Sequence, residues 1–338
     1  MFQTPDLFKN SQIYERYKGW HGVQAHIPVM VAETLELLAP APGKKILDCT
    51  VGAGGHAAEI LKRIQPGGLL IGLDRDPRML EQARAFLKEE GFPDNSLRLF
   101  PFSYERFDEA FAQETGTEPK LFDGILFDLG VASPHLDQAE RGFSWNKEGP
   151  LDFRFDAAQK LTAFDVVNKW RESELRRVFK EYSDERFSGA MARRICKERE
   201  VRIIKTTTQL ADILRKSIPS RLRSPHRDHV QTAFQAIRIA VNDELGIFEK
   251  TLPKALSFLA ENGVCAVLAY HSKEDRVSKI VFAEAAGKKG TGMFEILTKK
   301  PLMATNEEIR RNARARSARL RAIRRKPADS QSSNKEVK

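Results

Sequence analysis

The chain has 338 residues, of which 41% are hydrophobic and 30% are charged, a balance typical of a folded soluble protein and unlike that of a disordered one. Its apolar runs are too short to span a bilayer and its N-terminal stretch lacks the apolar core of a secretory signal, so we expect a cytoplasmic protein with no membrane partner. The formal net charge of +10 favours a polyanionic partner, and the three scattered cysteines predict neither a disulfide framework nor a metal site.

The first part of the chain alternates predicted strands with predicted helices. Strands are predicted at 45–48, 69–74, 97–100, 124–128 and 264–270. Helical patterns at 57–64 and 77–90 separate the first three strands, and the second helix begins with Asp76 as its N-cap and Pro77 as its first residue. This alternation predicts a parallel sheet covered on both faces, whose ligands bind at the carboxyl ends of the strands.

A glycine turn follows the first predicted strand. The pattern Gly52-x-Gly54-x-x-Ala57 matches the relaxed dinucleotide-binding fingerprint, and Gly52-Ala53-Gly54-Gly55 also matches the turn of methyltransferases that use S-adenosylmethionine. Small residues allow the backbone to approach a ligand closely. A tight strand-to-helix turn with no ligand is the third interpretation, so the motif alone does not choose a cofactor.

Two further residues stand where a nucleoside would lie. Asp74 ends the second strand, where a carboxylate can accept both hydroxyls of an adenosine ribose, a group that NAD and S-adenosylmethionine share. The alternative for Asp74 is an acid that caps the following helix or pairs with Arg75. Phe102 follows the third strand and could lie beside the adenine or a cationic sulfonium, a contact worth on the order of 1 kcal/mol, or it could pack in the core.

The fourth strand carries the most informative acid. Asp128 stands at its carboxyl end, before a turn that contains Gly130 and Ser133-Pro134. Methyltransferases that act on exocyclic amines of bases place an acid or amide and a proline at this position. An acceptor there draws on the amino protons and frees the nitrogen lone pair. Asp128 is therefore the candidate catalytic acceptor, with Ser133 beside it, and an acid that only stabilises the turn is the alternative.

After about residue 137 the strand signal disappears until the long helical pattern at 234–260, which predicts a helical insertion inside an α/β domain. The expected parts of the chain are an N-terminal extension at 1–24, a discontinuous α/β domain at 25–137 and 236–326, an all-helical insertion domain at 138–235, and a disordered tail at 327–338.

The insertion begins with "RGFSWNKEGPLDFRFD", where charged side chains alternate with aromatic ones. Arg141, Trp145 and Arg154 are candidates to close over a flipped base. The alternative is a structural lid whose aromatic rings pack on the insertion. His271 follows the strand at 264–270 and is a further catalytic candidate that could meet the target base, with a satisfied core histidine as the alternative.

The segment 310–326 carries eight arginines, one lysine and no acid. This density favours contact with a phosphate backbone over a solvated helix face or a frayed tail, and Arg314, Arg316 and Arg319 are the candidate residues.

Taken together, these motifs resemble the MraW (RsmH) family, bacterial methyltransferases of the N4 amine of a cytidine in 16S rRNA. The resemblance covers about residues 25–325 and is carried by "HIPVMVAETLELL", "LDCTVGAGGHAAEIL", "GLDRDP", "FDLGVASPHLDQAERGFSWNKEGPLDFRFD", "TAFDVVN", "FQAIRIAVNDEL", "YHSKEDR" and "ARSARLR". It implies a class I S-adenosylmethionine-dependent methyltransferase fold, Rossmann-like and mostly parallel, with an inserted helical domain. It also implies S-adenosyl-L-methionine as cofactor and the decoding region of the small ribosomal subunit as target.

The resemblance implies cofactor contacts from the first glycine loop, from Asp74, and from residues after the third and fourth strands. They are Gly52, Gly54, Gly55, His56, Asp74, Phe102, Asp128 and His135. His135 stands where the family usually has glutamine, and an imidazole cannot present a donor and an acceptor side by side as an amide does. Tyr270 and Lys273 replace a usual phenylalanine and leucine.

Two other functions fit parts of the sequence. An NAD-dependent oxidoreductase could use Gly52–Ala57 and Asp74, but it needs neither Asp128 with its proline turn nor the arginine-rich segment. A non-catalytic RNA-binding assembly factor is the third hypothesis, and the intact Asp74 and Asp128 argue against it. The oligomeric state stays open, with a homodimer as one option.

Overall fold

The structure, a computed structural model, describes residues 27–115, 121–131, 133–222 and 228–328. The chain forms two units. Unit 1 comprises Met1–Gly130 and Ile247–Lys338, and unit 2 comprises Val131–Gly246. The predicted N-terminal extension at 1–24 and residues 329–338 of the predicted tail lie outside the described residues.

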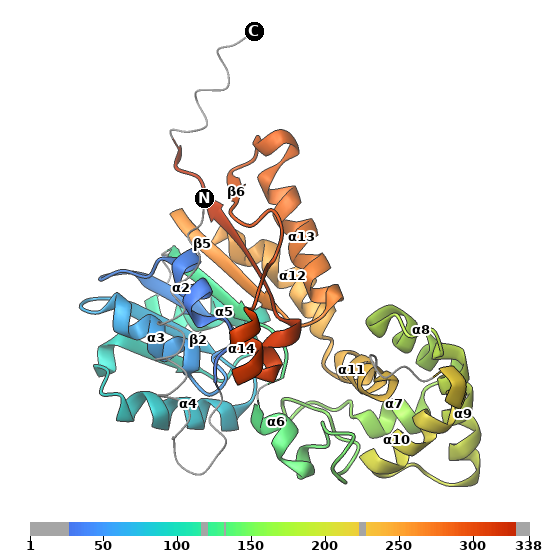
Figure 1. The fold of residues 1–338 in the computed structure, drawn as a ribbon. Helices are drawn as coiled ribbons and strands as arrows, with labels where there is room; N and C mark the ends of the chain where they lie inside the picture. Colours follow the sequence, from blue (N-terminus) through green and yellow to red (C-terminus); the bar gives the residue numbers. More distant parts are fainter. Residues whose placement is uncertain (1–26, 116–120, 132, 223–227, 329–338) are drawn as a thin grey trace. The chain divides into compact units, whose positions relative to one another are not determined.

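Unit 1 is built on one twisted sheet (Figure 1). Its strands are β1 (Lys45–Asp48), β2 (Leu69–Leu73), β3 (Leu97–Phe100), β4 (Phe122–Asp128), β5 (Leu259–Ala269), β6 (Phe294–Ile296), β7 (Leu302–Met303) and β8 (Arg319–Arg325). The order is β3-β2-β1-β4-β5-β8-β6, and β7 pairs with β8. The first five strands are parallel, whereas β8 runs antiparallel to β5, β6 and β7. This mostly parallel order with one reversed strand is the class I methyltransferase fold that the resemblance implies.

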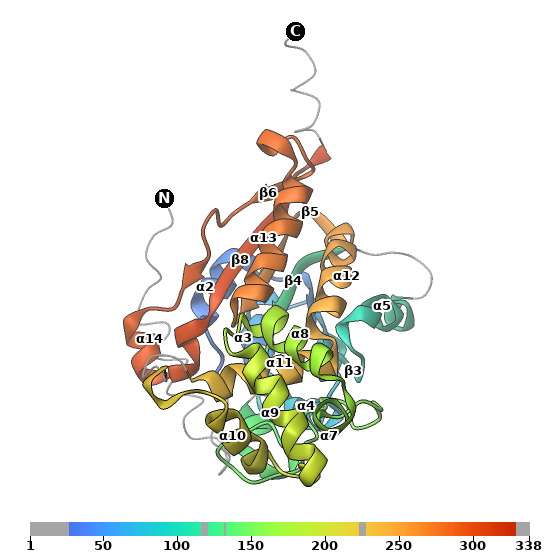
Figure 2. The ribbon, with the colours of Figure 1, turned by 90° about the vertical axis from the view of Figure 1, so that its right-hand side faces the viewer.

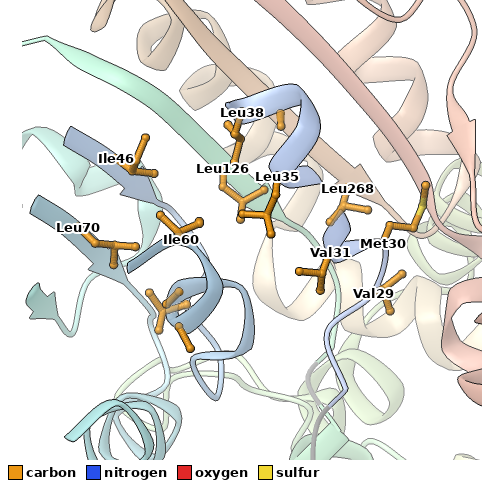
Figure 3. Packing of buried hydrophobic residues seen from close by; sticks show 14 of the residues in the cluster. Val29, Met30, Val31, Leu35, Leu38, Ile46, Ile60, Leu70, Leu126 and Leu268 are labelled. Atoms are coloured by element: carbon orange, nitrogen blue, oxygen red, sulfur yellow. The ribbon is translucent and has the colours of Figure 1, made fainter. Parts of the chain in front are cut away.

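Three helices cover one face of the sheet: α2 (Val31–Leu38), α3 (Gly55–Ile64) and α4 (Pro77–Glu89). Their apolar side chains form one core with alternate residues of the strands. Figure 3 shows Leu35 and Leu38 of α2 against Leu126 of β4, with Ile46 of β1 and Ile60 of α3 beside them. This burial of aliphatic side chains is the main force that holds the glycine turn before α3 against the strand ends.

The other face is packed by α5 (Phe107–Thr115), α12 (Glu244–Ser257) and α13 (Ser272–Ala286), of which α12 and α13 lie beside β5 and β8 in Figure 2. Phe127 of β4 meets Phe248 of α12 edge to face, and Phe107 meets Phe258 in the same way. After α13 and the short strands β6 and β7, the chain forms α14 (Asn306–Arg311) and a short 3₁₀ turn at Ala313–Ser317. It then enters β8.

Part of the basic segment is a strand, which excludes the two alternatives to a phosphate contact over that part. Residues 319–325 form β8 inside the sheet, so they are neither a helix face nor a frayed tail. Leu320, Ala322 and Ile323 are buried, and Arg321 is 7% exposed with its guanidinium 2.6 Å from Asp275. Alternate positions of a strand point to opposite sides, so Leu320 and Ala322 face one side and Arg321 and Ile323 the other, and both sides of this strand are buried.

The described part of unit 2 contains helices, an irregular segment at 142–162, and one isolated bridge between Pro150 and Thr206 in place of strands. Its helices are α6 (Ser133–Asp137), α7 (Ala163–Lys169), α8 (Glu172–Ser183), α9 (Ser188–Val201), α10 (Thr207–Lys216) and α11 (His229–Asn242). Capping boxes at Thr162 and Thr206 begin α7 and α10. Leu175, Phe179 and Leu210 are fully buried between these helices.

The prediction of one continuous helix at 234–260 is wrong, because two helices, α11 and α12, occupy this range. Asp243 adopts the left-handed conformation, with φ 46°, and separates α11 from α12. Residues of α11 such as Phe234 and Ile237 belong to the core of unit 2. Unit 2 therefore runs from 131 to 246, rather than from 138 to 235 as the sequence suggested.

Candidate active site

The carboxyl ends of neighbouring parallel strands bring three acids of unit 1 to one edge of the sheet. Asp48 ends β1 and Asp128 ends β4, and these two strands pair directly. Asp74 follows β2, the neighbour of β1 on the other side. This placement is what the sequence predicts for Asp74 and Asp128, whereas Asp48 received no role there.

The glycine turn is held by Asp74. Gly52 and Gly54 have φ values of 54° and 91°, a conformation that favours glycine, and Gly54 is the N-cap of α3. Gly52 N donates to Asp74 Oδ2 at 2.9 Å, and Asp76 N donates to Asp74 Oδ1 at 2.8 Å. A ribose bound at Asp74 would therefore share this carboxylate with the backbone donors of the turn. Asp76 caps α4 through Arg78 N, as predicted.

Asp128 is held by three groups. Its backbone N–H donates to Thr50 Oγ1 at 2.7 Å. Its Oδ1 accepts the hydroxyl of Tyr270 at 2.8 Å, and its Oδ2 lies 3.3 Å from His56 Nδ1. The carboxylate is 14% exposed, so it is fixed in the protein and still reachable from outside.

His56 bridges Asp128 and the segment before α2. Its Nε2 lies 3.0 Å from the carbonyl oxygen of Val29. Both partners of the ring are acceptors, so both contacts are hydrogen bonds only when the imidazole is protonated. Burial lowers the pKa of His56, but the hydrogen bond and charge of Asp128, together with the charge of Asp48, outweigh burial and raise the pKa above its ordinary value.

Asp48 is the site residue that the sequence analysis missed. It is 1% exposed; its Oδ1 accepts from Thr50 N at 3.0 Å, and its Oδ2 is buried with no hydrogen-bond partner among the described residues. Burial raises its pKa to about 7, against the opposing effects of Thr50 N–H and His56. The available signal was an acid at the end of an apolar strand, directly before a glycine turn.

The segment 27–30 crosses the glycine turn. A Cβ on Gly55 would come 3.0 Å from Pro28, so only glycine fits under this segment without a shift. On its other side, Met30 N donates to Glu308 at 2.7 Å and Asn312 Nδ2 donates to the carbonyl oxygen of Ile27 at 3.1 Å. The C-terminal helix α14 and the turn after it therefore hold the chain that His56 contacts.

Phe102 follows β3 and is half-buried. Its ring is stacked on Phe100 with centroids 6.0 Å apart, and the guanidinium of Arg106 lies 4.3 Å from its centroid. Part of the ring is thus already in contact with a cation of the protein, and its role beside a cofactor stays a prediction.

The other two catalytic candidates, His271 and Ser133, each stand at the start of a helix. His271 is the N-cap of α13, where it forms a capping box with Glu274. Its Nε2 lies 3.0 Å from Glu274 Oε1 in an alignment that makes no hydrogen bond. Ser133 begins α6, and its side chain lies outside the described part of the structure.

In unit 2, the predicted site residues make contacts within that unit. His135 is 4% exposed and packs against Phe143 and Phe155. Arg154 is paired with Asp152 at 2.7 Å. Arg141 donates to the carbonyl oxygens of Arg154 and Phe155, and Trp145 packs edge to face on Phe234. The phenylalanines of this segment are core residues, which agrees with the structural alternative for them.

The candidate RNA contacts of the arginine-rich segment lie at one end of β8. Arg314 and Arg316 belong to the turn before it, and Arg316 is exposed. Arg319 begins β8 and is in register with Ala269, the last residue of β5 and the neighbour of Tyr270. These arginines therefore approach the edge of the sheet that carries Asp128. Arg324, at the far end of β8, is paired with Glu295.

The described residues contain neither a cluster of metal ligands nor a helix that could span a membrane. No cluster of three or more histidine, cysteine or acidic side chains there could hold a metal ion. No helix among these residues has the length and apolar character needed to cross a bilayer.

Comparison with known proteins gives a family match and close relatives. The model of the MraW methylase family matches residues 23–326. "Ribosomal RNA small subunit methyltransferase H" of Symbiobacterium thermophilum is 42% identical over 312 residues, covering 88% of this chain and 96% of that protein. Proteins of the same name from Heliobacterium mobile and Thermobifida fusca are each 42% identical; they cover 88% and 89% of this chain, and the alignments span 97% and 93% of those proteins.

Proposed function

The chain belongs to the MraW methylase family, and on that premise we propose that it methylates the N4 amine of a cytidine in 16S rRNA of the small ribosomal subunit. The observation that supports this proposal most strongly is Asp128, a carboxylate at the carboxyl end of β4 with both oxygens oriented by neighbours. The cofactor is S-adenosyl-L-methionine, which when bound supplies an activated methyl group.

The chemistry explains why an acceptor is needed at this position. The N4 amine of cytosine is a poor nucleophile, because its lone pair is delocalised into the ring. Asp128 accepts hydrogen bonds from the amino protons, turns the nitrogen towards tetrahedral geometry and helps its proton leave. Most of the remaining acceleration comes from holding the amine in line with the carbon that it attacks.

The residues around Asp128 fit the cofactor. The backbone of the turn at Gly52, Gly54 and Gly55 leaves room for a close approach, and Asp74 suits a ribose. Asp48 has a buried carboxylate oxygen with no hydrogen-bond partner among the described residues, and a cationic ammonium group would satisfy it. A buried acid of this kind is costly unless a partner arrives, which supports a ligand with a positive group.

Membership of a methylase family removes the oxidoreductase alternative. The non-catalytic alternative is set aside because Asp128 and Asp74 are both present and held by specific hydrogen bonds. Arg314, Arg316 and Arg319 are proposed to contact the RNA backbone at the edge of the sheet. The proposal also gives Arg141, Trp145 and Arg154 roles at the target base. It further includes a cytoplasmic location and a homodimer, and light scattering tests the homodimer.

The proposal is tested by methyl transfer to small subunits purified from cells that lack this gene. The subunits are incubated with the enzyme and labelled S-adenosyl-L-methionine, and nuclease fragments of the rRNA are analysed by mass spectrometry. We expect one methyl group on the N4 nitrogen of one cytidine. Transfer to C5 or to a ribose hydroxyl, or no transfer with cofactor bound, would overturn the proposal.

A further inference from the structure

Tyr270 brings a phenolic hydroxyl to Asp128, although the resemblance assigns no role to this residue. Its hydroxyl donates to Asp128 Oδ1 at 2.8 Å, whereas His56 approaches the other carboxylate oxygen. A phenylalanine at this position would fill nearly the same space and leave Oδ1 without this donor. The hydroxyl therefore adds an interaction that packing alone does not require.

The backbone explains why Tyr270 reaches Asp128. Strands β4 and β5 are parallel, with Asp128 in register with Leu268, and Leu129 N donates to the carbonyl oxygen of Leu268 at 3.0 Å. Tyr270 is two residues beyond Leu268, so its side chain leaves the strand on the same face. The hydrogen bond between Tyr270 and Asp128 thus follows from the pairing of these two strands.

The ring of Tyr270 is itself fixed. Its backbone N–H donates to Glu274 Oε2 at 2.8 Å, and Glu274 belongs to the capping box that begins α13. A Cβ on Gly130 would come 3.1 Å from Tyr270 Cδ2, so the ring lies against the backbone directly after the end of β4. The first turn of α13 and the turn after Asp128 hold the hydroxyl in place.

Tyr270 remains a donor in neutral solution. Burial, with the neighbouring charge of Asp128, raises the pKa of Tyr270 well above its ordinary value, so the phenol keeps its proton. A carboxylate can accept about four hydrogen bonds, and Tyr270 and His56 use two of these positions. The remaining positions are available to the two protons of an exocyclic amine.

We propose that Tyr270 is a positioning residue that fixes the carboxylate of Asp128 in the orientation in which it accepts the protons of the substrate amine. This inference rests on the proposed function, because it assumes that Asp128 acts on that amine. The terminal χ2 torsion of an aspartate rotates easily unless the carboxylate is held. A carboxylate with a partner on only one oxygen would therefore spend less time in the orientation that accepts the amine protons. Alignment of this kind acts on the rate of the chemical step and not on cofactor binding.

The test compares wild type with Tyr270→Phe, and Tyr182→Phe serves as control, because Tyr182 is a half-buried tyrosine of α8 in unit 2. Single-turnover methyl transfer to unmethylated small subunits is measured beside the Kd for S-adenosylhomocysteine and the melting temperature. We expect Tyr270→Phe to lower the rate by about tenfold or more, as expected for loss of a hydrogen bond to a charged group, with the Kd unchanged. Tyr182→Phe should leave both values unchanged.

A crystal structure of Tyr270→Phe supplies a readout apart from activity, since Asp128 should then show more than one carboxylate orientation. A variant as fast as wild type would overturn the inference and leave the proposed function intact. A fall in cofactor affinity equal to the fall in rate would also overturn it, because Tyr270 would then act on binding. Failure of the proposed function is distinct: wild type itself would form no N4-methylcytidine.

Discussion

Glu308 accepts the backbone N–H of Met30 at 2.7 Å, and this hydrogen bond joins α14, near the end of the chain, to the residue that precedes α2. Burial raises the pKa of Glu308 to about 7; Met30 N–H opposes the shift and Glu33 adds to it. The same segment carries the carbonyl oxygen of Val29 that His56 contacts. The stability of this junction should therefore depend on pH.

Replacing Glu308 with glutamine should remove this pH dependence of stability. Because the folded pKa is raised, the acid favours folding most below its ordinary pKa near 4.5 and loses that contribution as the pH rises through about 7. Glutamine keeps an acceptor for Met30 N–H and does not titrate. The variant should lose less stability than wild type between about pH 5 and about pH 8, as measured by urea unfolding. Glu307→Gln, at an acid paired with Arg311, is the control, and parallel curves for all three proteins would contradict the prediction.

Asp74→Ala should weaken binding of S-adenosylhomocysteine by about 1.5–3 kcal/mol, through loss of a charged hydrogen-bond acceptor. The structure adds a complication, because Asp74 also accepts from Gly52 N and Asp76 N. Asp74→Asn keeps an acceptor for only one of these two bonds, so it should lower the melting temperature less than Asp74→Ala while still weakening affinity. Calorimetry and thermal unfolding separate the two effects, and unchanged affinity in Asp74→Ala would remove the ribose assignment.

The buried carboxyl of Asp48 predicts pH-dependent cofactor binding. Its pKa is about 7, so the fraction that is ionised rises between about pH 6 and about pH 7.5, and only the ionised form attracts an ammonium group. S-adenosylhomocysteine should bind more tightly at the higher pH and release protons as it binds. Asp48→Asn should reduce this dependence. His56 and Glu308 also titrate near this region, so Glu308→Gln is the matched control. An equal dependence of cofactor affinity on pH in wild type and Asp48→Asn would contradict the role given to Asp48.

RNA binding is tested with point variants, because deleting residues after 309 would remove β8 from the sheet. The double variant Arg316→Ala with Arg319→Ala should weaken binding to 16S rRNA and flatten its salt dependence by about 0.7–0.9 per lost phosphate contact. Arg324→Ala is the control, since Arg324 lies at the opposite end of β8 and is paired with Glu295. A salt slope that does not change in the double variant would show that these arginines are structural.

The sheet and its glycine turn could be predicted from the sequence, because each depends on local periodicity and on short motifs. β8 could not, since arginines interrupt its apolar positions and its partner β5 lies far away in the sequence. The break at Asp243 was also beyond prediction: a single residue in the left-handed conformation divides one continuous helical pattern.

For the site, the sequence identifies residues but not their relationships. Asp74, Asp128 and His56 were all named, yet the hydrogen bond from Tyr270 and the unsatisfied oxygen of Asp48 arise only when distant strands pair. The contact of Glu308 with Met30 joins residues from the two ends of unit 1, and no local pattern encodes it.

The most direct test of the central claim, that Asp128 acts on the substrate amine, is Asp128→Ala measured in two ways on the same preparation. We predict that single-turnover methylation of small subunits falls by about 10²–10⁴-fold, the usual contribution of a positioned general base, while the Kd for S-adenosylhomocysteine stays within about twofold of wild type. Retained turnover, or a loss of cofactor affinity as large as the loss of rate, would contradict the account.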